Sequence, residues 1–273
     1  MPDGPGLKPV TTHALLQMKE KGERIVMLTC YDALFARLLD ASGVDVLLVG
    51  DSVNQVLAGA DSTLSATLDQ MIYHTKIVRR GTQRAMVVCD MPFLTYQVTK
   101  EEAIRNGGRV MAETGCQAIK VEGGRAIADT VRAVVDVGIP VMGHLGLTPQ
   151  SVHALGGHRV QGRDDKTAQR LKEDAKTLED AGAFAIVLEL VPAPLAAEIT
   201  QALTIPTIGI GAGKDCDGQV LVLHDLLGLN DRFAAKFVKR YANLAEEVKQ
   251  AVQGFAAEVR NGKYPDAEHS FQK

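Results

Sequence analysis

The chain has 273 residues, 46% of them hydrophobic and 23% charged, which suffices for one α/β barrel or two small domains. A formal net charge of −3 argues against nucleic-acid or anionic-lipid partners, and no apolar run reaches transmembrane length. Its four cysteines lie far apart without a C-x-x-C pair, so we expect buried thiols, a reducing compartment and a soluble cytoplasmic protein.

Short apolar runs alternate with amphipathic segments after a helical pattern at 11–22. The runs are typical of strands buried on both faces and cover 25–30, 44–50, 85–90, 116–122, 139–145, 184–190 and 205–211. An eighth, 219–227, could equally begin a helix. Helices are predicted over 31–43, 99–115, 167–182 and 193–203, with a long closing helix over 231–262. Thr99 with Glu102 indicates a capping box, and Gly115 and Gly182 indicate helix ends.

Repeated strand–helix units indicate a parallel sheet with right-handed crossovers. Seven or eight units in about 200 residues favour a closed (β/α)₈ barrel, with an open Rossmann or flavodoxin-like sheet as the alternative. The helix over 11–22 could close the barrel bottom. No linker is visible, so we expect one domain over 1–273, with 1–8 flexible.

Ionisable residues stand where five successive predicted strands end. They are Asp51, Asp90, Lys120 with Glu122, His144 and Glu189. Strand ends of a barrel meet at its catalytic rim, and residues two apart point to the same side. Taken singly, each has a structural explanation, such as a helix cap, a core histidine or a rim salt bridge. A ring of carboxylates at a buried mouth instead predicts a compensating cation.

Oxygen ligands without a Cys–His cluster favour a hard cation, with Mg²⁺ as the first choice. Such a site suits chelation of a 2-oxo acid, whose enolate the metal would stabilise. Proton removal from the adjacent carbon needs a base, and Glu189 comes from the far side of the ring.

Two further segments follow strands. The glycine-rich stretch at 207–213 fits either a phosphate site or a tight loop that lets backbone approach a neighbour. The segment 146–165, rich in glycine and polar residues, is predicted to be a lid or binding loop on the catalytic face.

The chain resembles the ketopantoate hydroxymethyltransferase family from about residue 9 to 271. The resemblance is carried by the following motifs: "VGDS" (49–52), "DSTLSATLDQMIYHTKIVRRG" (61–81), "DMPF" (90–93), "KVEGG" (120–124), "GHLGLTPQS" (143–151), "VQGR" (160–163), "GIGAG" with "CDGQVLV" (209–222) and "HSF" (269–271). It implies a (β/α)₈ barrel of the phosphoenolpyruvate/pyruvate superfamily. It also implies transfer of a one-carbon unit from 5,10-methylenetetrahydrofolate to 3-methyl-2-oxobutanoate, giving 2-dehydropantoate for pantothenate biosynthesis.

The resemblance also implies residue roles. Asp51 and Asp90 correspond to ligands of one Mg²⁺ per subunit, with Glu122 in the same sphere directly or through water. Ser52, Lys120 and the metal hold the oxo-acid. Asp51 and Asp90, as the metal ligands, also belong to the substrate-binding residues. Glu189 corresponds to the acid/base, and His144 to a further substrate-pocket residue. The family forms homo-oligomers, commonly decamers.

One position departs from the family pattern. The family usually has a glycine two residues after "VGDS", where this chain has Asn54, which tolerates left-handed backbone better than most residues. Two other functions stay open: a metal-dependent 2-oxo-acid lyase or mutase on the same barrel, and a barrel that only binds an oxo-acid. The residues leave the metal open among Mg²⁺, Mn²⁺ and Co²⁺, and they do not indicate how the folate is held.

Overall fold

The computed structural model describes residues 8–231 and 235–272. The chain divides into two compact units, Met1–Val222 and Leu223–Lys273. The single domain predicted over 1–273 stays a prediction. Of the residues expected to be flexible, 1–7 lie outside the described residues.

The first unit contains a closed barrel of eight strands in chain order, each pair of neighbours parallel. The strands are β1 Ile25–Thr29, β2 Val46–Val49, β3 Met86–Asp90, β4 Ala118–Glu122, β5 Val141–Gly146, β6 Ala185–Glu189, β7 Thr207–Ile210 and β8 Gly218–Leu221. The predicted (β/α)₈ barrel is therefore confirmed, and the open-sheet alternative is wrong.

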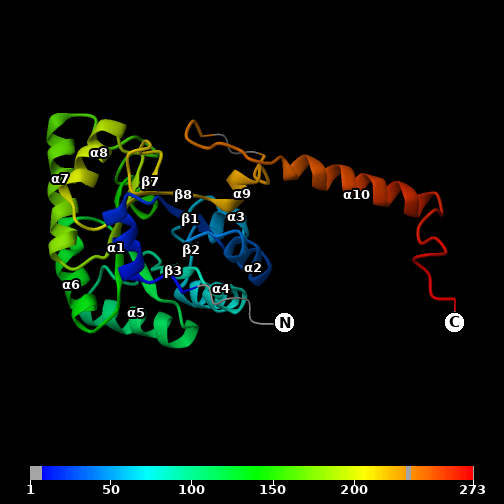
Figure 1. Ribbon diagram of the computed structural model, residues 1–273, viewed down its shortest axis with the longest axis horizontal. Coiled ribbons are helices and arrows are strands. Elements are labelled where there is room, and N and C mark those ends of the chain that lie inside the picture. The colour runs from blue at the N-terminus through cyan, green and yellow to red at the C-terminus, as the bar shows by residue number, and fades with distance from the viewer. Residues whose placement is uncertain (1–7, 232–234, 273) are drawn as a thin grey trace. The chain divides into compact units, whose positions relative to one another are not determined.

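One helix precedes β1, and the helices after it connect successive strands from β1 to β7 on the outside of the barrel (Figure 1). They are α1 Thr12–Lys21, α2 Ala33–Ala41, α3 Val53–Val56, α4 Leu68–Gly81, α5 Lys100–Thr114, α6 Ala128–Asp136, α7 Asp165–Asp180 and α8 Ala193–Ala202, with 3₁₀ turns η1 Arg125–Ile127 and η2 Pro149–Ser151. The four helices predicted between the strands are present, three with slightly shorter bounds and the one predicted over 167–182 beginning and ending two residues earlier.

Local capping explains where several helices begin and end. The Thr99 side chain accepts a hydrogen bond from Glu102 N at the start of α5, and Gly115 ends that helix at φ +70°. A full capping box, with both reciprocal bonds, forms at Thr67 and Gln70 at the start of α4. Side-chain caps of this kind satisfy backbone N–H groups that a helix leaves free at its first turn.

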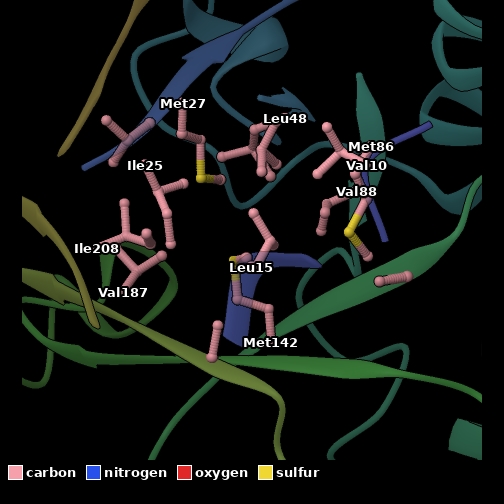
Figure 2. Packing of buried hydrophobic residues seen from close by; sticks show 14 residues of the cluster. Val10, Leu15, Ile25, Met27, Leu48, Met86, Val88, Met142, Val187 and Ile208 are labelled. Atoms are coloured by element: carbon pink, nitrogen blue, oxygen red, sulfur yellow. The ribbon is translucent and has the colours of Figure 1, made fainter. Parts of the chain in front are cut away.

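Apolar side chains from every strand fill the part of the barrel where the strands begin, which is called its lower part below. Leu15 of α1 is 1% exposed and packs among them, as Figure 2 shows beside Ile25, Met27 and Met142. Lys19 of the same helix binds Asp217 Oδ2 at 2.8 Å. Helix α1 therefore closes the end of the barrel at which the strands begin, as predicted.

The period of two carries this interior orientation up each strand. Met86 and Val88 belong to the apolar cluster, so Asp90 points inward as well. Ala118 places Lys120 and Glu122 inside in the same way. These charged side chains, at the rim where the strands end, therefore also point into the barrel.

The second unit contains two helices, α9 Leu223–Leu226 and α10 Leu244–Arg260. The run 219–227 therefore holds both a strand end and a helix start. Of the predicted helix over 231–262, residues 232–234 lie outside the described residues. The prediction is wrong for 235–243, because Tyr241 N and Leu244 N bond to carbonyls of 226 and 227. In the part of the chain that the structure describes, no helix is long and apolar enough to cross a membrane.

Candidate active site

A buried group of charged side chains fills the upper barrel, where the strands end. Asp51, Asp90, Lys120, Glu122 and His144 are each only 3–6% exposed. Charged residues are seldom this buried unless they pair with one another or bind an ion. The structure thus brings together the residues that the sequence predicted at five separate strand ends.

Strand register determines the first two pairs. Asp90 is aligned with Lys120, and their side chains form an ion pair with Oδ1–Nζ at 3.0 Å. Glu122 is aligned with His144 on the next strand, with Oε1–Nδ1 at 3.3 Å. Lys120 Nζ also lies 3.1 Å from His144 Nδ1, so the two pairs form one network.

Glu189 at the end of β6 joins the network from the opposite side of His144. Its Oε2 lies 3.1 Å from His144 Nε2, and its side chain keeps 17% exposure. The backbone around it is tightly held: Leu147 N donates to Glu189 O at 2.8 Å, and Leu190 N donates to Ile210 O at 2.9 Å. Glu189 is therefore the member of the group that is both positioned by a histidine and accessible to a ligand.

Asp51 is linked to the rest through its backbone and its carboxylate. Its N–H donates to Asp90 Oδ2 at 3.0 Å, which places the two aspartates next to each other. Gln150 Nε2 donates to Asp51 Oδ2 at 2.9 Å, and Gln150 N donates to Glu122 Oε2 at 2.9 Å. Gln150 thus connects two carboxylates that come from different strands.

Ser52 and Asn54 lie in the turn that follows Asp51. Ser52 Oγ is 2.8 Å from the buried hydroxyl of Tyr31. Asn54 is buried in α3, and its Nδ2 donates to Ser62 O at 3.0 Å and to Ser65 Oγ at 2.7 Å. Among the described residues, left-handed backbone outside glycine occurs at Leu94 and Leu190, so Asn54 does not need it. The Asn54 side chain instead holds the loop "DSTLS" (61–65) in place through these two hydrogen bonds.

The two aspartates carry more negative charge than their surroundings balance. Burial, followed by the charges of Asp90 and Glu122, raises the pKa of Asp51 well above its ordinary range. Burial also raises the pKa of Asp90, although Lys120 acts in the opposite direction. A cation bound beside them would relieve this repulsion and favour the ionised forms.

The basic groups and Glu122 are better compensated. Burial lowers the pKa of Lys120, but the surrounding carboxylates more than offset this and leave it above its ordinary value. Burial and the Lys120 charge lower the pKa of His144, but Glu122 and Glu189 raise it to about 9. Burial raises the pKa of Glu122, but bonds from His144 and others leave it below its ordinary value.

The donor set fits Mg²⁺ held by two carboxylates. No three His, Cys, Asp or Glu side chains of the described residues form a ready-made metal cluster. Mg²⁺ requires fewer, because it typically binds one or two carboxylates and keeps water or substrate in its other positions. The neighbouring Asp51 and Asp90 could supply this pair, with Glu122 close by, and each oxygen of Asp90 and of Glu122 also has a protein partner.

Comparison with known proteins agrees with this chemistry. A family model described as "Ketopantoate hydroxymethyltransferase" matches residues 9–267. The chain belongs to the ketopantoate hydroxymethyltransferase family. Relatives named 3-methyl-2-oxobutanoate hydroxymethyltransferase include those of Syntrophus aciditrophicus, 56% identical with 97% of each chain covered, and Moorella thermoacetica, 57% identical with 96% of this chain and 98% of the relative covered.

Solved structures with this fold extend beyond the hydroxymethyltransferase family. Phosphonopyruvate hydrolase superposes with a TM-score of 0.64 at 11% identity, covering 97% of this chain and 92% of that one. A 2,3-dimethylmalate lyase described as a PEP mutase/isocitrate lyase superfamily member gives 0.59 at 17% identity, covering 96% and 92%. Identities this low show a shared fold alone.

Sequence reasoning missed two ketopantoate hydroxymethyltransferase residues that organise the site. Gln150 lies inside the quoted motif "GHLGLTPQS" but is neither charged nor at a strand end. Tyr96, in the loop after β3, donates to Gln150 Oε1 at 2.9 Å and accepts from Glu122 N at 3.0 Å. The motif was the only available signal for Gln150, because neither its burial nor its partners follow from strand periodicity.

The glycine-rich stretch and the long loop also take definite forms. Gly213 has φ +84°, and a Cβ there would lie 2.5 Å from Ala193 Cβ at the start of α8. This close approach supports the tight-loop interpretation of the stretch at 207–213. The segment 146–165 follows β5 and contributes η2, including Gln150, to the site. It is thus part of the catalytic rim.

Proposed function

We propose that this site transfers a hydroxymethyl group from 5,10-methylenetetrahydrofolate to 3-methyl-2-oxobutanoate, forming 2-dehydropantoate in pantothenate biosynthesis. Family membership supports the activity, and the relatives cited above are named for this oxo-acid. The observation that carries the proposal is the buried arrangement of paired aspartates, a lysine and a partly accessible glutamate. These are the groups that deprotonation next to a keto group requires.

The substrate end of the site is formed by Asp51, Asp90, Lys120 and Ser52. Asp51 and Asp90 would hold one Mg²⁺, with Glu122 in the same sphere directly or through water. When bound, Mg²⁺ supplies Lewis-acid stabilisation of negative charge on the oxo-acid oxygens. Lys120, kept protonated by its carboxylate neighbours, and the Ser52 hydroxyl orient the substrate carboxylate and keto groups.

Glu189 acts as the base. It removes the proton from C3 of the oxo-acid, and the resulting enolate carbon bonds to the one-carbon unit, which water releases from the folate at the oxidation level of formaldehyde. Water thereby supplies the hydroxyl oxygen, and its two protons go to the two folate nitrogens as both C–N bonds break. The proton held by Glu189 passes to the new alkoxide. His144 holds the Glu189 carboxylate through Nε2 and borders the substrate pocket.

Proton NMR of 3-methyl-2-oxobutanoate in D₂O tests this function. With enzyme and Mg²⁺ the C3 proton is expected to exchange, EDTA should stop the exchange, and methylenetetrahydrofolate should then yield the hydroxymethyl product. Exchange without product on adding the folate would favour a lyase or mutase. No exchange by the folded protein would contradict the proposed base chemistry and favour a binding role.

The active form is proposed to be a homo-oligomer, with a decamer as the family precedent. Helix α10 supports this, because it has no buried residue. Its Val248, Val252, Phe255 and Val259 are 46–60% exposed at the spacing of one helix face. A second copy of the chain would cover this stripe, and analytical ultracentrifugation would count the subunits.

The proposed location is the cytoplasm. Cys30, Cys89, Cys116 and Cys216 are free and buried, as expected in a reducing compartment. Fractionation of the native host, with the enzyme followed by immunoblot, would test the location.

A further inference from the structure

A hollow of about 630 Å³ lies in the loop between β5 and α7. Arg159 and Arg163 both line it, together with His158 and Asp164. Both arginines are exposed, and neither guanidinium forms an ion pair with a carboxylate of the described residues. The hollow therefore presents two uncompensated cations on the face that carries the active site.

Asp164 does not neutralise these arginines, because its carboxylate is used by α7. It accepts hydrogen bonds from Thr167 N at 3.0 Å and Thr167 Oγ1 at 2.6 Å. These bonds lower the pKa of Asp164 and keep it ionised. The lining thus carries the charges of two arginines and one aspartate, and the aspartate faces the helix start.

The hollow is attached to the strand end that carries the base. Gln161 N donates to Leu190 O at 2.8 Å, and Leu190 directly follows Glu189. Leu190 has φ +47°, an uncommon conformation for a non-glycine residue. Gly162 has φ +81°, and a Cβ there would lie 2.5 Å from Leu195 of α8. The loop is thus packed against the segment immediately beyond Glu189.

We propose that this hollow binds the glutamate tail of the folate co-substrate. The inference rests on the proposed function, which requires the pterin end of the folate to reach the oxo-acid beside Glu189. The opposite end of tetrahydrofolate carries at least two carboxylates, and each additional γ-linked glutamate adds one. Guanidinium groups bind carboxylates in a two-pronged geometry, so Arg159 and Arg163 match this ligand class.

The test compares mono- and triglutamate forms of 5,10-methylenetetrahydrofolate as substrates. Wild-type enzyme is expected to have the lower KM for the triglutamate. The Arg159→Gln/Arg163→Gln double variant should raise that KM about 3- to 30-fold, the scale of two exposed ion pairs. The rise should be smaller for the monoglutamate and should shrink at high salt. Calorimetric binding of tetrahydropteroyl mono- and triglutamate, without oxo-acid, should show the same difference in Kd.

Arg105→Gln is the matched control, because Arg105 is an exposed arginine on α5, outside the hollow. It should change neither KM nor Kd. Equal affinity for both folate forms in the wild type, or an equal loss of both in the double variant, would overturn the inference while leaving catalysis intact. Absence of turnover with either form would contradict the proposed function, whereas the calorimetric comparison would still decide the tail site.

Discussion

The side-chain amide of Gln150 donates to Asp51 Oδ2 at 2.9 Å, across a separation of 99 residues. The same nitrogen donates to Met91 O at 2.9 Å, and Gln150 Oε1 accepts from Tyr96 Oη. Every hydrogen-bonding position of this buried amide is therefore used, and its orientation is determined. One oxygen of Asp51 is held in place, and the other is left for a ligand.

Replacing Gln150 by glutamate should lower the stability of the metal-free protein. The change removes the donor to Asp51 and places a second carboxylate oxygen beside it, in a site that already has excess negative charge. Losing a buried donor costs about 1–3 kcal/mol, which urea unfolding of the metal-free protein would detect. Gln83→Glu, at an exposed position, is the control. Unchanged stability of the metal-free Gln150→Glu protein would show that the amide does not position Asp51.

Asp51→Asn and Asp90→Asn should each weaken Mg²⁺ binding at least about tenfold, equivalent to about 1.4 kcal/mol. The amide keeps the shape of the side chain but removes the charge that attracts the cation. Calorimetric titration with Mg²⁺ measures this independently of turnover. Asp136→Asn, on the exposed side of α6, should bind Mg²⁺ as the wild type does. Wild-type affinity in both site variants would contradict the ligand assignment.

Glu189→Gln should spare Mg²⁺ binding and slow C3 proton exchange by about 10²–10⁴-fold, the usual contribution of a general base. The amide can still meet His144 Nε2 but cannot accept the substrate proton. Exchange measured by NMR, beside Mg²⁺ titration of the same sample, separates the two effects. Full-rate exchange would mean that another group or water is the base. Exchange lost together with metal binding would indicate a structural role instead.

A stability difference that depends on pH is expected at Glu179, far from the chemistry. Its Oε1 accepts from Thr204 N at 2.6 Å and Thr204 Oγ1 at 2.8 Å, and its Oε2 pairs with Lys176 at 2.7 Å. Burial raises the pKa of Glu179, but these partners together have the larger effect. The pKa therefore lies below its ordinary value. On acidification, the unfolded chain therefore takes up the proton first.

Wild type should exceed Glu179→Gln in stability by roughly 1 kcal/mol near neutral pH, the scale of one hydrogen-bonding interaction. The difference should be lost as pH falls below about 4.3, the unfolded value, through the lower folded pKa. Urea unfolding of both proteins between neutral and acidic pH measures it, with the exposed Glu101→Gln as control. A difference that stays constant with pH would contradict the charge-based explanation.

Strand periodicity accounts for most of what could be predicted. Apolar runs located all seven confident strands, and the alternation that buries Met86 and Val88 also directs Asp90 into the barrel. The same rule, applied to each strand end, predicts that the charged residues lie together at one rim of the barrel. The position of Asp51 follows less directly from periodicity, since Asp51 lies after the end of its strand and depends on the turn that begins at Gly50.

Elements without such a period were predicted less well. The start of α10 was placed too early, because backbone bonds from 241 and 244 to carbonyls of 226 and 227 replace helical ones. The sequence predicts a left-handed backbone as the role of Asn54. The structure shows instead that its side chain donates hydrogen bonds to residues 62 and 65. Both outcomes depend on partners that are distant enough in sequence to leave no local pattern.

Which side chains face the barrel interior can be read from the sequence, because a strand's alternation is local and repeats every two residues. Which of them pair depends on how the strands align in the fold. The register of β3 with β4 sets Asp90 against Lys120, and that of β4 with β5 sets Glu122 against His144. The loops that bring Gln150, Tyr96 and the Arg159–Arg163 hollow to the rim obey no such period. Their positions follow from hydrogen bonds and packing between residues far apart in the chain.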